Sequence, residues 1–235
     1  MSKEYIPPQN GKPLIQVTRL SKHYSNGHGV ISVLRGVNLE VRPGEMLAVM
    51  GPSGSGKSTL LFILGLLLPA SSGNYQFMGQ NMLDLSRTAQ AEFRRQRVGF
   101  VFQNCDLFEN STVFENLEFP LVYAKVERQD RPDRIASALE RVNLAHRIHH
   151  PANYLSGGER QQVAIARALV NQPLVILADE PTGHLDRANG QMVMDHFEQI
   201  VAAGDTALII VTHDTEVAAR CTRVFSLEDG ILNEN

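Results

Sequence analysis

Cysteine, an excess of one charge and long apolar runs are all scarce in this sequence, and each shortage excludes a class of protein. The two cysteines, Cys105 and Cys221, have no metal-ligand spacing and make no disulfide framework, which is typical of a reducing cytoplasm. A net charge of −3 gives no global attraction to nucleic acid or to anionic lipid. We therefore expect neither a disulfide-stabilised secreted protein nor a partner of nucleic acid.

The apolar segments are too short to span a membrane. The longest one, residues 60–70, has eleven residues and is interrupted by Gly65 and Pro69, whereas a membrane-spanning helix needs about 20. The first eight residues lack the apolar core of a signal peptide. With 43% apolar and 20% charged residues among 235, the composition is that of a globular protein with a substantial core. We expect a chain that is not exported and does not cross a membrane, and we interpret residues 60–70 as a buried helix.

Residues 51–59, Gly-Pro-Ser-Gly-Ser-Gly-Lys-Ser-Thr, form a glycine-rich loop between a strand pattern at 46–50 and a helix pattern beginning at Leu60. The glycines let successive N–H groups point inward, and the following helix adds the positive end of its dipole. The Lys57 ammonium suits β- and γ-phosphates, and the Ser58 hydroxyl suits Mg²⁺. A flexible linker that happens to carry a lysine is the alternative, and the flanking strand and helix argue against it. The loop therefore predicts binding of a nucleoside triphosphate.

The order of apolar patterns predicts an α/β fold in which a mostly parallel sheet is flanked by helices. Strands are expected at residues 14–20, 33–41, 46–50, 74–78, 98–102, 174–178, 207–212 and 224–227. Helices are expected at residues 60–70, 89–97, 113–123, 132–142, 156–170 and 188–203. Residues 1–13 read as a flexible leader before one domain at 14–235, and residues 104–155 as an inserted helical subdomain.

Two adjacent acids follow the continuous apolar strand at 174–178. This strand delivers Asp179 and Glu180 to its carboxyl end, where ligands bind in open α/β sheets. Asp179 would hold Mg²⁺ through water, and Glu180 would orient or deprotonate the attacking water. His213 stands at the end of the 207–212 strand, where it could cap a helix or contact the γ-phosphate.

The segment Ser156-Gly157-Gly158-Glu159 opens a predicted helix and has two compatible interpretations. Ser156 and Glu159 have the spacing of a capping box, which predicts a well-capped helix. Two glycines in the first turn lower helix propensity, however, and a bare helix N-terminus is a place that a phosphate can approach. We keep both interpretations.

Three further groups of residues have a structural and a functional interpretation. Tyr24 is either an aromatic at the edge of the core or a surface on which adenine stacks, and spacing alone favours the first. Three histidines lack an acidic or cysteine partner at ligand spacing, which favours surface positions over a metal cluster: His146, His149 and His150. Three arginines are interpreted as solvated because no aromatic residues interleave with them: Arg94, Arg95 and Arg97.

With these motifs in place, the sequence resembles the nucleotide-binding subunit of an ATP-binding cassette (ABC) transporter over residues 14–230. The resemblance rests on six features in the expected order, namely Tyr24, the Walker A loop 51–59, Gln103, the signature 155–159, the Walker B end Asp179-Glu180, and His213. Residues 98–103, 163–169 and 178–183 are similar to the lipoprotein-releasing and macrolide-export subgroup (LolD- and MacB-like). The resemblance implies a phosphate-loop (RecA-like) core, an N-terminal antiparallel β region and an inserted helical subdomain.

The resemblance also implies a role for each matched residue. ATP would be bound by Tyr24, Gly51, Pro52, Ser53, Gly54, Ser55, Gly56, Lys57, Ser58, Thr59 and Gln103. Catalysis would fall to Glu180, His213 and Lys57, and Mg²⁺ would be held by Ser58, Gln103 and, through water, Asp179. The signature residues Ser156, Gly157, Gly158 and Glu159 would contact ATP held by an opposing subunit, and Asp186 would lie at the dimer contact. The active unit would be a head-to-tail dimer with two ATP molecules between the subunits.

The function implied is ATP hydrolysis that powers separately encoded permease subunits from the cytoplasmic face of the inner membrane, with no nucleic acid partner. Motion would pass to the membrane through residues 104–150. One alternative is an FtsE-like ATPase that regulates cell-wall hydrolases. Another is a soluble ABC ATPase of translation or DNA repair, although those usually carry two cassettes or a long coiled coil. The sequence departs from its subgroup at His184, which replaces a usual asparagine, and at residues 65–68.

Overall fold

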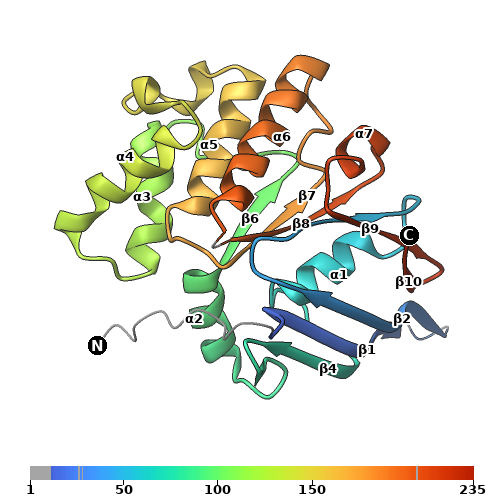
Figure 1. The fold of residues 1–235 in the computed structure, drawn as a ribbon. Helices are drawn as coiled ribbons and strands as arrows, with labels where there is room; N and C mark the ends of the chain where they lie inside the picture. The colour runs from blue at the N-terminus through green and yellow to red at the C-terminus, as the bar shows by residue number, and fades with distance from the viewer. Residues whose placement is uncertain (1–11, 26, 28, 205) are drawn as a thin grey trace.

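The fold is described from a computed structural model that covers residues 12–25, 27, 29–204 and 206–235. The predicted leader at 1–13 lies outside the described residues except for its last two. Within the described ranges the strands form a six-stranded sheet, in the order β10-β9-β3-β8-β7-β6, and a four-stranded sheet, in the order β2-β1-β4-β5. Figure 1 shows the two sheets with helix α1 between them.

The six-stranded sheet carries the candidate site at one edge. Its strands are β3 (Met46–Met50), β6 (Val98–Phe102), β7 (Val175–Asp179), β8 (Ala207–Thr212), β9 (Arg223–Glu228) and β10 (Ile231–Glu234). All neighbouring pairs run parallel except β10 with β9. Every residue of β8 is buried, as expected for a strand covered on both faces. The carboxyl ends of β3, β6, β7 and β8 therefore meet at one edge of the sheet.

The antiparallel sheet packs on the opposite side of helix α1 (Lys57–Leu64). It contains β1 (Ile15–Ser25), β2 (Val30–Val41), β4 (Ser72–Phe77) and β5 (Gln80–Asn81). Apolar residues of both sheets and of α1 share one core. The buried Tyr75 hydroxyl donates a 2.6 Å hydrogen bond to the carbonyl of Leu64, which ties β4 to the last turn of α1. The helix behind the phosphate loop is thus fixed from both sides.

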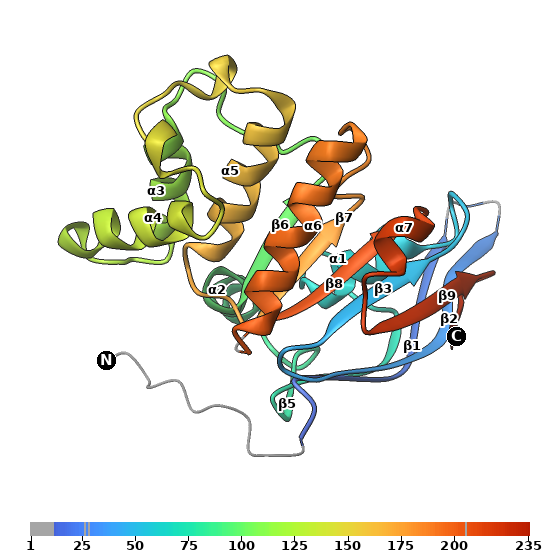
Figure 2. The same cartoon turned by 45° about the horizontal axis from the view of Figure 1, so that its top comes forward.

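Helix α2 (Arg87–Arg97) packs beside the antiparallel sheet, where the Phe93 ring lies 4.8 Å from the ring of Phe77 on β4. The remaining helices lie on the other side of the parallel sheet and beyond its β6 edge. They are α3 (Val113–Tyr123), α4 (Arg131–Glu140), α5 (Gly157–Leu169), α6 (Arg187–Ala202) and α7 (Thr215–Ala218), with 3₁₀ turns at Arg128–Asp130, Ala145–Arg147 and Ala152–Tyr154. Figure 2 shows α3 and α4 projecting away from the antiparallel sheet, with α5 linking them to the β strands. A second core joins α3, α4, α5 and α6 to the parallel sheet.

The predicted fold class is confirmed, whereas some predicted bounds are wrong. Strands β3, β6 and β8 begin and end at the predicted residues. The helix expected at 60–70 instead ends at Leu64, because Gly65 caps it and Leu66 takes a left-handed conformation with φ of 57°. The short elements β5, β10 and α7 were not predicted. In the part of the chain that the structure describes, none of the helices combines the length and apolar character needed to span a bilayer.

Candidate nucleotide-binding site

The glycine-rich loop joins the end of β3 to the start of α1. Gly54 and Gly56 take left-handed conformations with φ of 81° and 106°, which glycine adopts without strain, and Gly56 is the N-cap of the helix. The Lys57 ammonium folds back over the loop and donates to the carbonyls of Gly51 at 2.8 Å and Pro52 at 3.0 Å. The helix N-terminus and this ammonium together make a positively charged concave surface.

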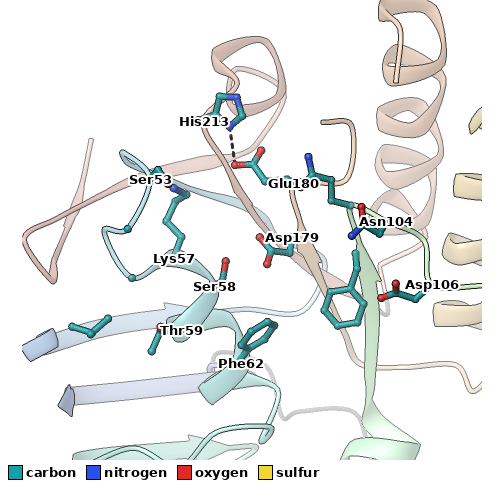
Figure 3. Close-up of a pocket in the computed structure, with 15 residues that line it drawn as sticks. Ser53, Lys57, Ser58, Thr59, Phe62, Asn104, Asp106, Asp179, Glu180 and His213 are labelled. Atoms are coloured by element: carbon teal, nitrogen blue, oxygen red, sulfur yellow. Dashed lines mark hydrogen bonds and ion pairs between the residues drawn. The ribbon is translucent and has the colours of Figure 1, made fainter. Parts of the chain in front are cut away.

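A cavity of about 1100 Å³ opens in front of the loop at the carboxyl edge of the sheet. That volume lies just above the usual range of about 300–1,000 Å³ for small-molecule sites. Figure 3 shows its labelled side chains converging from the loop, from the ends of β6 and β7, and from the segment after β8. The lining residues are Val33, Ser53, Gly54, Gly56, Lys57, Ser58, Thr59, Phe62, Phe102, Gln103, Asn104, Asp106, Asp179, Glu180 and His213. The structure therefore brings together most of the predicted loop, Gln103, both acids and His213. Three predicted loop residues are not among those that line the cavity: Gly51, Pro52 and Ser55.

The two acids after β7 have different surroundings. Burial raises the pKa of Asp179, with a smaller raising effect from Glu180, while the neighbouring Ser58 and Lys57 act in the lowering direction. Glu180 takes a left-handed conformation with φ of 45°. Its Oε1 lies 2.8 Å from His213 Nδ1, the contact drawn as a dashed line in Figure 3, and its Oε2 accepts a 3.0 Å hydrogen bond from Thr212.

The oxygen atoms of Ser58 and Asp179 are compatible with a magnesium ion. Hydroxyl and carboxylate oxygens are the hard ligands that Mg²⁺ prefers, and this ion usually takes one or two protein carboxylates together with substrate phosphates. Ser58 is the second residue of α1, and Asp179 is the last residue of β7. The three histidines considered as a metal cluster, His146, His149 and His150, are exposed.

Tyr24 lies apart from the cavity. It is 41% exposed near the end of β1, and it is not among the described residues that line the cavity or form the core. The interpretation of Tyr24 as an aromatic at the edge of the core therefore does not fit. The Lys22 ammonium lies 4.8 Å from the centroid of the Tyr24 ring and donates to the carbonyl of Pro69 at 2.8 Å, so it covers one ring face.

The signature residues begin α5, and within the described chain they do not line the cavity. The predicted capping box is present: Glu159 N donates to Ser156 Oγ, and Ser156 N donates to Glu159 Oε2 at 2.9 Å. Arg147 donates to Glu159 Oε1 at 2.9 Å. The pKa of Glu159 is lowered, mainly by the hydrogen bond from the Ser156 backbone N–H and to a smaller extent by the Ser156 hydroxyl and by Arg147. Within one chain, the phosphate loop and the signature therefore do not line the same cavity.

Asp186 caps the next helix rather than facing the cavity. Its Oδ1 accepts from the backbone N–H of Asn189 at 2.9 Å, its Oδ2 accepts from the Asn189 side chain at 2.7 Å, and these bonds lower the pKa of Asp186. Asn189 also packs directly against Gly158 of the signature. The departure His184 is exposed in the turn before Asp186.

Several residues of the site were missed by sequence reasoning. Arg167 on α5 donates to the carbonyls of Cys105 at 2.6 Å and Asp106 at 2.7 Å, two consecutive residues with left-handed φ. The Cys105 thiol donates to Gln161, which ties the segment after Gln103 to the signature helix a second time. No sequence spacing indicates these contacts. Thr212 could have been found, because it precedes His213 at the end of a predicted parallel strand.

These features together define a class: a phosphate-loop nucleotide-binding protein, with acids from a neighbouring parallel strand facing the loop. Residues 34–183 match the family described as ABC transporter, and the chain belongs to this family. It is an ATP-binding cassette that hydrolyses ATP, as the sequence predicted.

Known proteins of two kinds are similar to the chain. It is 44% identical to the lipoprotein-releasing system ATP-binding protein LolD of Shewanella frigidimarina (strain NCIMB 400) over 227 residues, which cover 95% of this chain and 94% of that protein. It is 46% identical to the macrolide export ATP-binding/permease protein MacB of Rhodopseudomonas palustris (strain BisB18) over 213 residues, covering 91% of this chain but 32% of that protein. The chain therefore spans about a third of the MacB relatives it matches.

A solved structure extends the similarity to three dimensions. A dimeric post-hydrolysis structure of the ATP-binding cassette MJ0796, bound to ADP and Pi, has a TM-score of 0.85 and 36% sequence identity, covering 94% of this chain and 97% of that one. The fold expected from the resemblance is thus confirmed.

Proposed function

We propose that the chain is the ATP-hydrolysing subunit that powers a separately encoded membrane permease of the lipoprotein-releasing or macrolide-export type, from the cytoplasmic face of the inner membrane. The observation that carries the catalytic part is the position of Glu180 across the cavity from the phosphate loop, held by His213. A relative that is 44% identical over 95% of the chain is named as the ATP-binding protein of a lipoprotein-releasing system, which supports the transport part.

Within the cavity each residue has a proposed task. The backbone N–H groups of the loop and Lys57 bind the β- and γ-phosphates, which requires the ammonium to exchange its two carbonyl partners for phosphate oxygens. Glu180 orients the attacking water or accepts its proton, and His213 turns toward the γ-phosphate. Ser58, Gln103 and, through water, Asp179 would hold Mg²⁺, which when bound neutralises charge that develops on the phosphates.

The second half of the site is proposed to come from another copy of the chain. The signature helix N-terminus and Ser156 provide N–H and O–H donors for a γ-phosphate, yet within the described residues of one chain they lie outside the cavity. The similar cassette MJ0796 has been solved as a dimer with ADP and Pi, which supports the formation of a dimer. The proposed arrangement is head-to-tail, with Asp186 at the contact, because this would bring the signature of one chain to the phosphate loop of the other. Closure of such a dimer on ATP, and its reopening after hydrolysis, would supply the motion.

An aromatic groove between the parallel sheet and the helical region is the proposed permease contact. It encloses about 410 Å³ and is lined by Leu67, Arg94, Arg95, Val98, Gly99, Phe100, Phe102, Phe108, Phe119, Pro120, Tyr123, Arg167, Ala168 and Asn171. Phe108, Phe119 and Tyr123 are exposed, and the Phe119 ring packs at a tilt against both of the others, with centroid distances of 4.9 Å to Phe108 and 4.7 Å to Tyr123. The exposed aromatic rings fit an amphipathic cytoplasmic segment, and the partly exposed Arg95 beside them favours acidic residues on that segment.

A pull-down from membranes tests the proposal. The Glu180→Gln protein with ATP and Mg²⁺ should retain a four-span permease with a periplasmic domain, and Phe119→Glu should abolish this retention. Ile231→Glu, which changes an exposed apolar residue on β10 away from the groove, is the matched control and should retain the permease. A peptidoglycan hydrolase in place of a transport partner would point to the FtsE-like alternative, and the absence of any membrane protein would contradict the proposal.

A further inference from the structure

Thr212, the last residue of β8, is positioned by strand register beside Glu180. In the parallel ladder Asp179 of β7 pairs with Val211 of β8, and the Glu180 N–H donates to the carbonyl of Val211 at 2.9 Å. The next residue on β8 therefore lies next to Glu180 at the sheet edge. The Thr212 hydroxyl oxygen is 3.0 Å from Glu180 Oε2, and Thr212 is fully buried.

The hydrogen bonds around Thr212 fix the direction of its single hydroxyl proton. The hydroxyl oxygen accepts from the backbone N–H of Asp214 at 3.1 Å, which engages a lone pair. An ionised Glu180 carboxylate can only accept. The proton of the Thr212 hydroxyl therefore points to Glu180 Oε2. Because threonine is β-branched and this side chain is buried, rotation about χ1 that would break the bond is strongly restricted.

The two partners of Glu180 differ in how freely they can leave it. His213 bonds Oε1 at 2.8 Å, but its side chain is 74% exposed, so it can rotate toward a γ-phosphate without loss of packing. Thr212 cannot do so, since it is enclosed at the end of a strand whose residues are all buried. When His213 turns away, Thr212 is the remaining described side chain that hydrogen-bonds Glu180.

We propose that Thr212 is a positioning residue for Glu180. It holds Oε2 throughout the ATP cycle and leaves Oε1 as the oxygen that meets the attacking water once His213 turns to the phosphate. The proposal rests on the proposed role of Glu180. Thr212 itself does not touch ATP and keeps its proton, so its effect should fall on the rate of hydrolysis and not on nucleotide binding.

Removal of the hydroxyl tests this directly. Thr212→Val keeps the shape of the side chain and should lower kcat for ATP hydrolysis by about 10- to 100-fold, the range for a hydrogen bond to a charged group, with KM for ATP changed by less than about two-fold. Thr212→Ser keeps the hydroxyl and should restore most of kcat. With ATP, the Thr212→Val protein should accumulate as an ATP-bound dimer, a result that a purely structural defect would not produce.

Thr206→Val is the matched control for loss of a buried hydroxyl. Thr206 precedes the other end of β8, is buried, and donates to the carbonyl of Pro173 at 2.9 Å, away from the cavity. This variant should lose stability and keep its kcat per folded molecule, as measured alongside thermal unfolding. If Thr212→Val does not fold, Thr212→Ala removes the same hydroxyl from a smaller side chain and takes its place.

The Glu180→Gln background separates this proposal from the proposed function. There, Thr212→Val should cause no further loss of the residual rate, because the group that it positions is already gone. Normal hydrolysis by Glu180→Gln would overturn the proposed role of Glu180. Two outcomes would overturn the role of Thr212 and leave that of Glu180 intact. One is an inactive Glu180→Gln protein together with a wild-type kcat for Thr212→Val. The other is an equal loss of kcat in Thr212→Val and Thr206→Val.

Discussion

The two signature glycines differ in what an added methyl group would meet, although they are adjacent in the first turn of α5. A Cβ at Gly157 would have one neighbour, Leu185 Cδ2 at an ordinary 3.7 Å. A Cβ at Gly158 would overlap the side-chain amide oxygen of Asn189 and lie 2.8 Å from its Cγ. Asn189 cannot simply turn aside, because its side-chain nitrogen is bonded to Asp186 at 2.7 Å.

The magnitudes follow from these contacts. Alanine in place of glycine favours a helix by roughly 0.5–1 kcal/mol, so Gly157→Ala should stabilise the protein slightly. Overpacking a tight contact costs about 1–3 kcal/mol, so Gly158→Ala should be destabilising after the same helix gain is subtracted. For a chain of this size each kcal/mol shifts Tm by about 2–4 °C, which makes the two variants separable.

Urea unfolding of the nucleotide-free variants, followed by circular dichroism, measures the difference. Gly157→Ala should have a midpoint at or above that of the wild type, and Gly158→Ala should unfold at lower urea with an unchanged slope. The double variant Gly158→Ala/Asn189→Ala removes the overlapping atoms, so the two changes should cost less together than the sum of their separate effects. Equal midpoints for the two single variants, or strict additivity in the double variant, would refute this account of the signature.

Two further predictions concern buried polar side chains. Burial lowers the pKa of His196, whose ring contacts the Gln162 amide at 3.3 Å, so below pH about 6.5 the unfolded chain binds a proton that the folded chain resists. The free energy of unfolding should therefore decrease as the pH is lowered, by up to about 1.4 kcal/mol per pH unit. His196→Gln should flatten this slope, which urea titrations at pH 7.5 and 5.5 measure. Tyr75→Phe leaves the carbonyl of Leu64 unsatisfied and should lower the free energy of unfolding by about 1–3 kcal/mol. As the control, Tyr123→Phe changes an exposed side chain and should have no measurable effect. Equal urea midpoints for the two variants would contradict the expectation for Tyr75.

The fold class and the extents of several strands could be predicted because the local sequence determines them. Strands β6 and β8 consist almost entirely of short apolar runs, so the pattern of hydrophobicity indicates where they lie. The end of α1 could not be predicted in this way, because apolar residues continue past it. Gly65 ends the helix where its backbone packs against Phe100 and Leu177, and a Cβ there would overlap the Phe100 ring. These partners come from other strands, and a linear pattern does not contain them.

The same distinction applies to the site. The glycine-rich loop and the strand-end acids are contiguous motifs, and the structure places them around one cavity. The contact of Arg147 with Glu159 and that of Arg167 with Cys105 join segments that are far apart in the sequence or lie in irregular turns. Sequence spacing can also mislead. For Tyr24 it favoured a position at the edge of the core, whereas the residue is exposed in the structure. Sequence motifs thus indicate candidate residues, whereas the groups that orient them depend on tertiary packing.

We propose that two chains complete each ATP site, with the phosphate loop of one facing the signature of the other. Sedimentation velocity of the Glu180→Gln protein with and without ATP and Mg²⁺ measures whether ATP joins the two chains. We expect a monomer without ATP and a dimer carrying two ATP molecules with it, and we expect Ser156→Arg in the same background to bind ATP and remain monomeric. A Glu180→Gln protein that stays monomeric when saturated with ATP, or a Ser156→Arg variant that dimerises equally well, would contradict the claim.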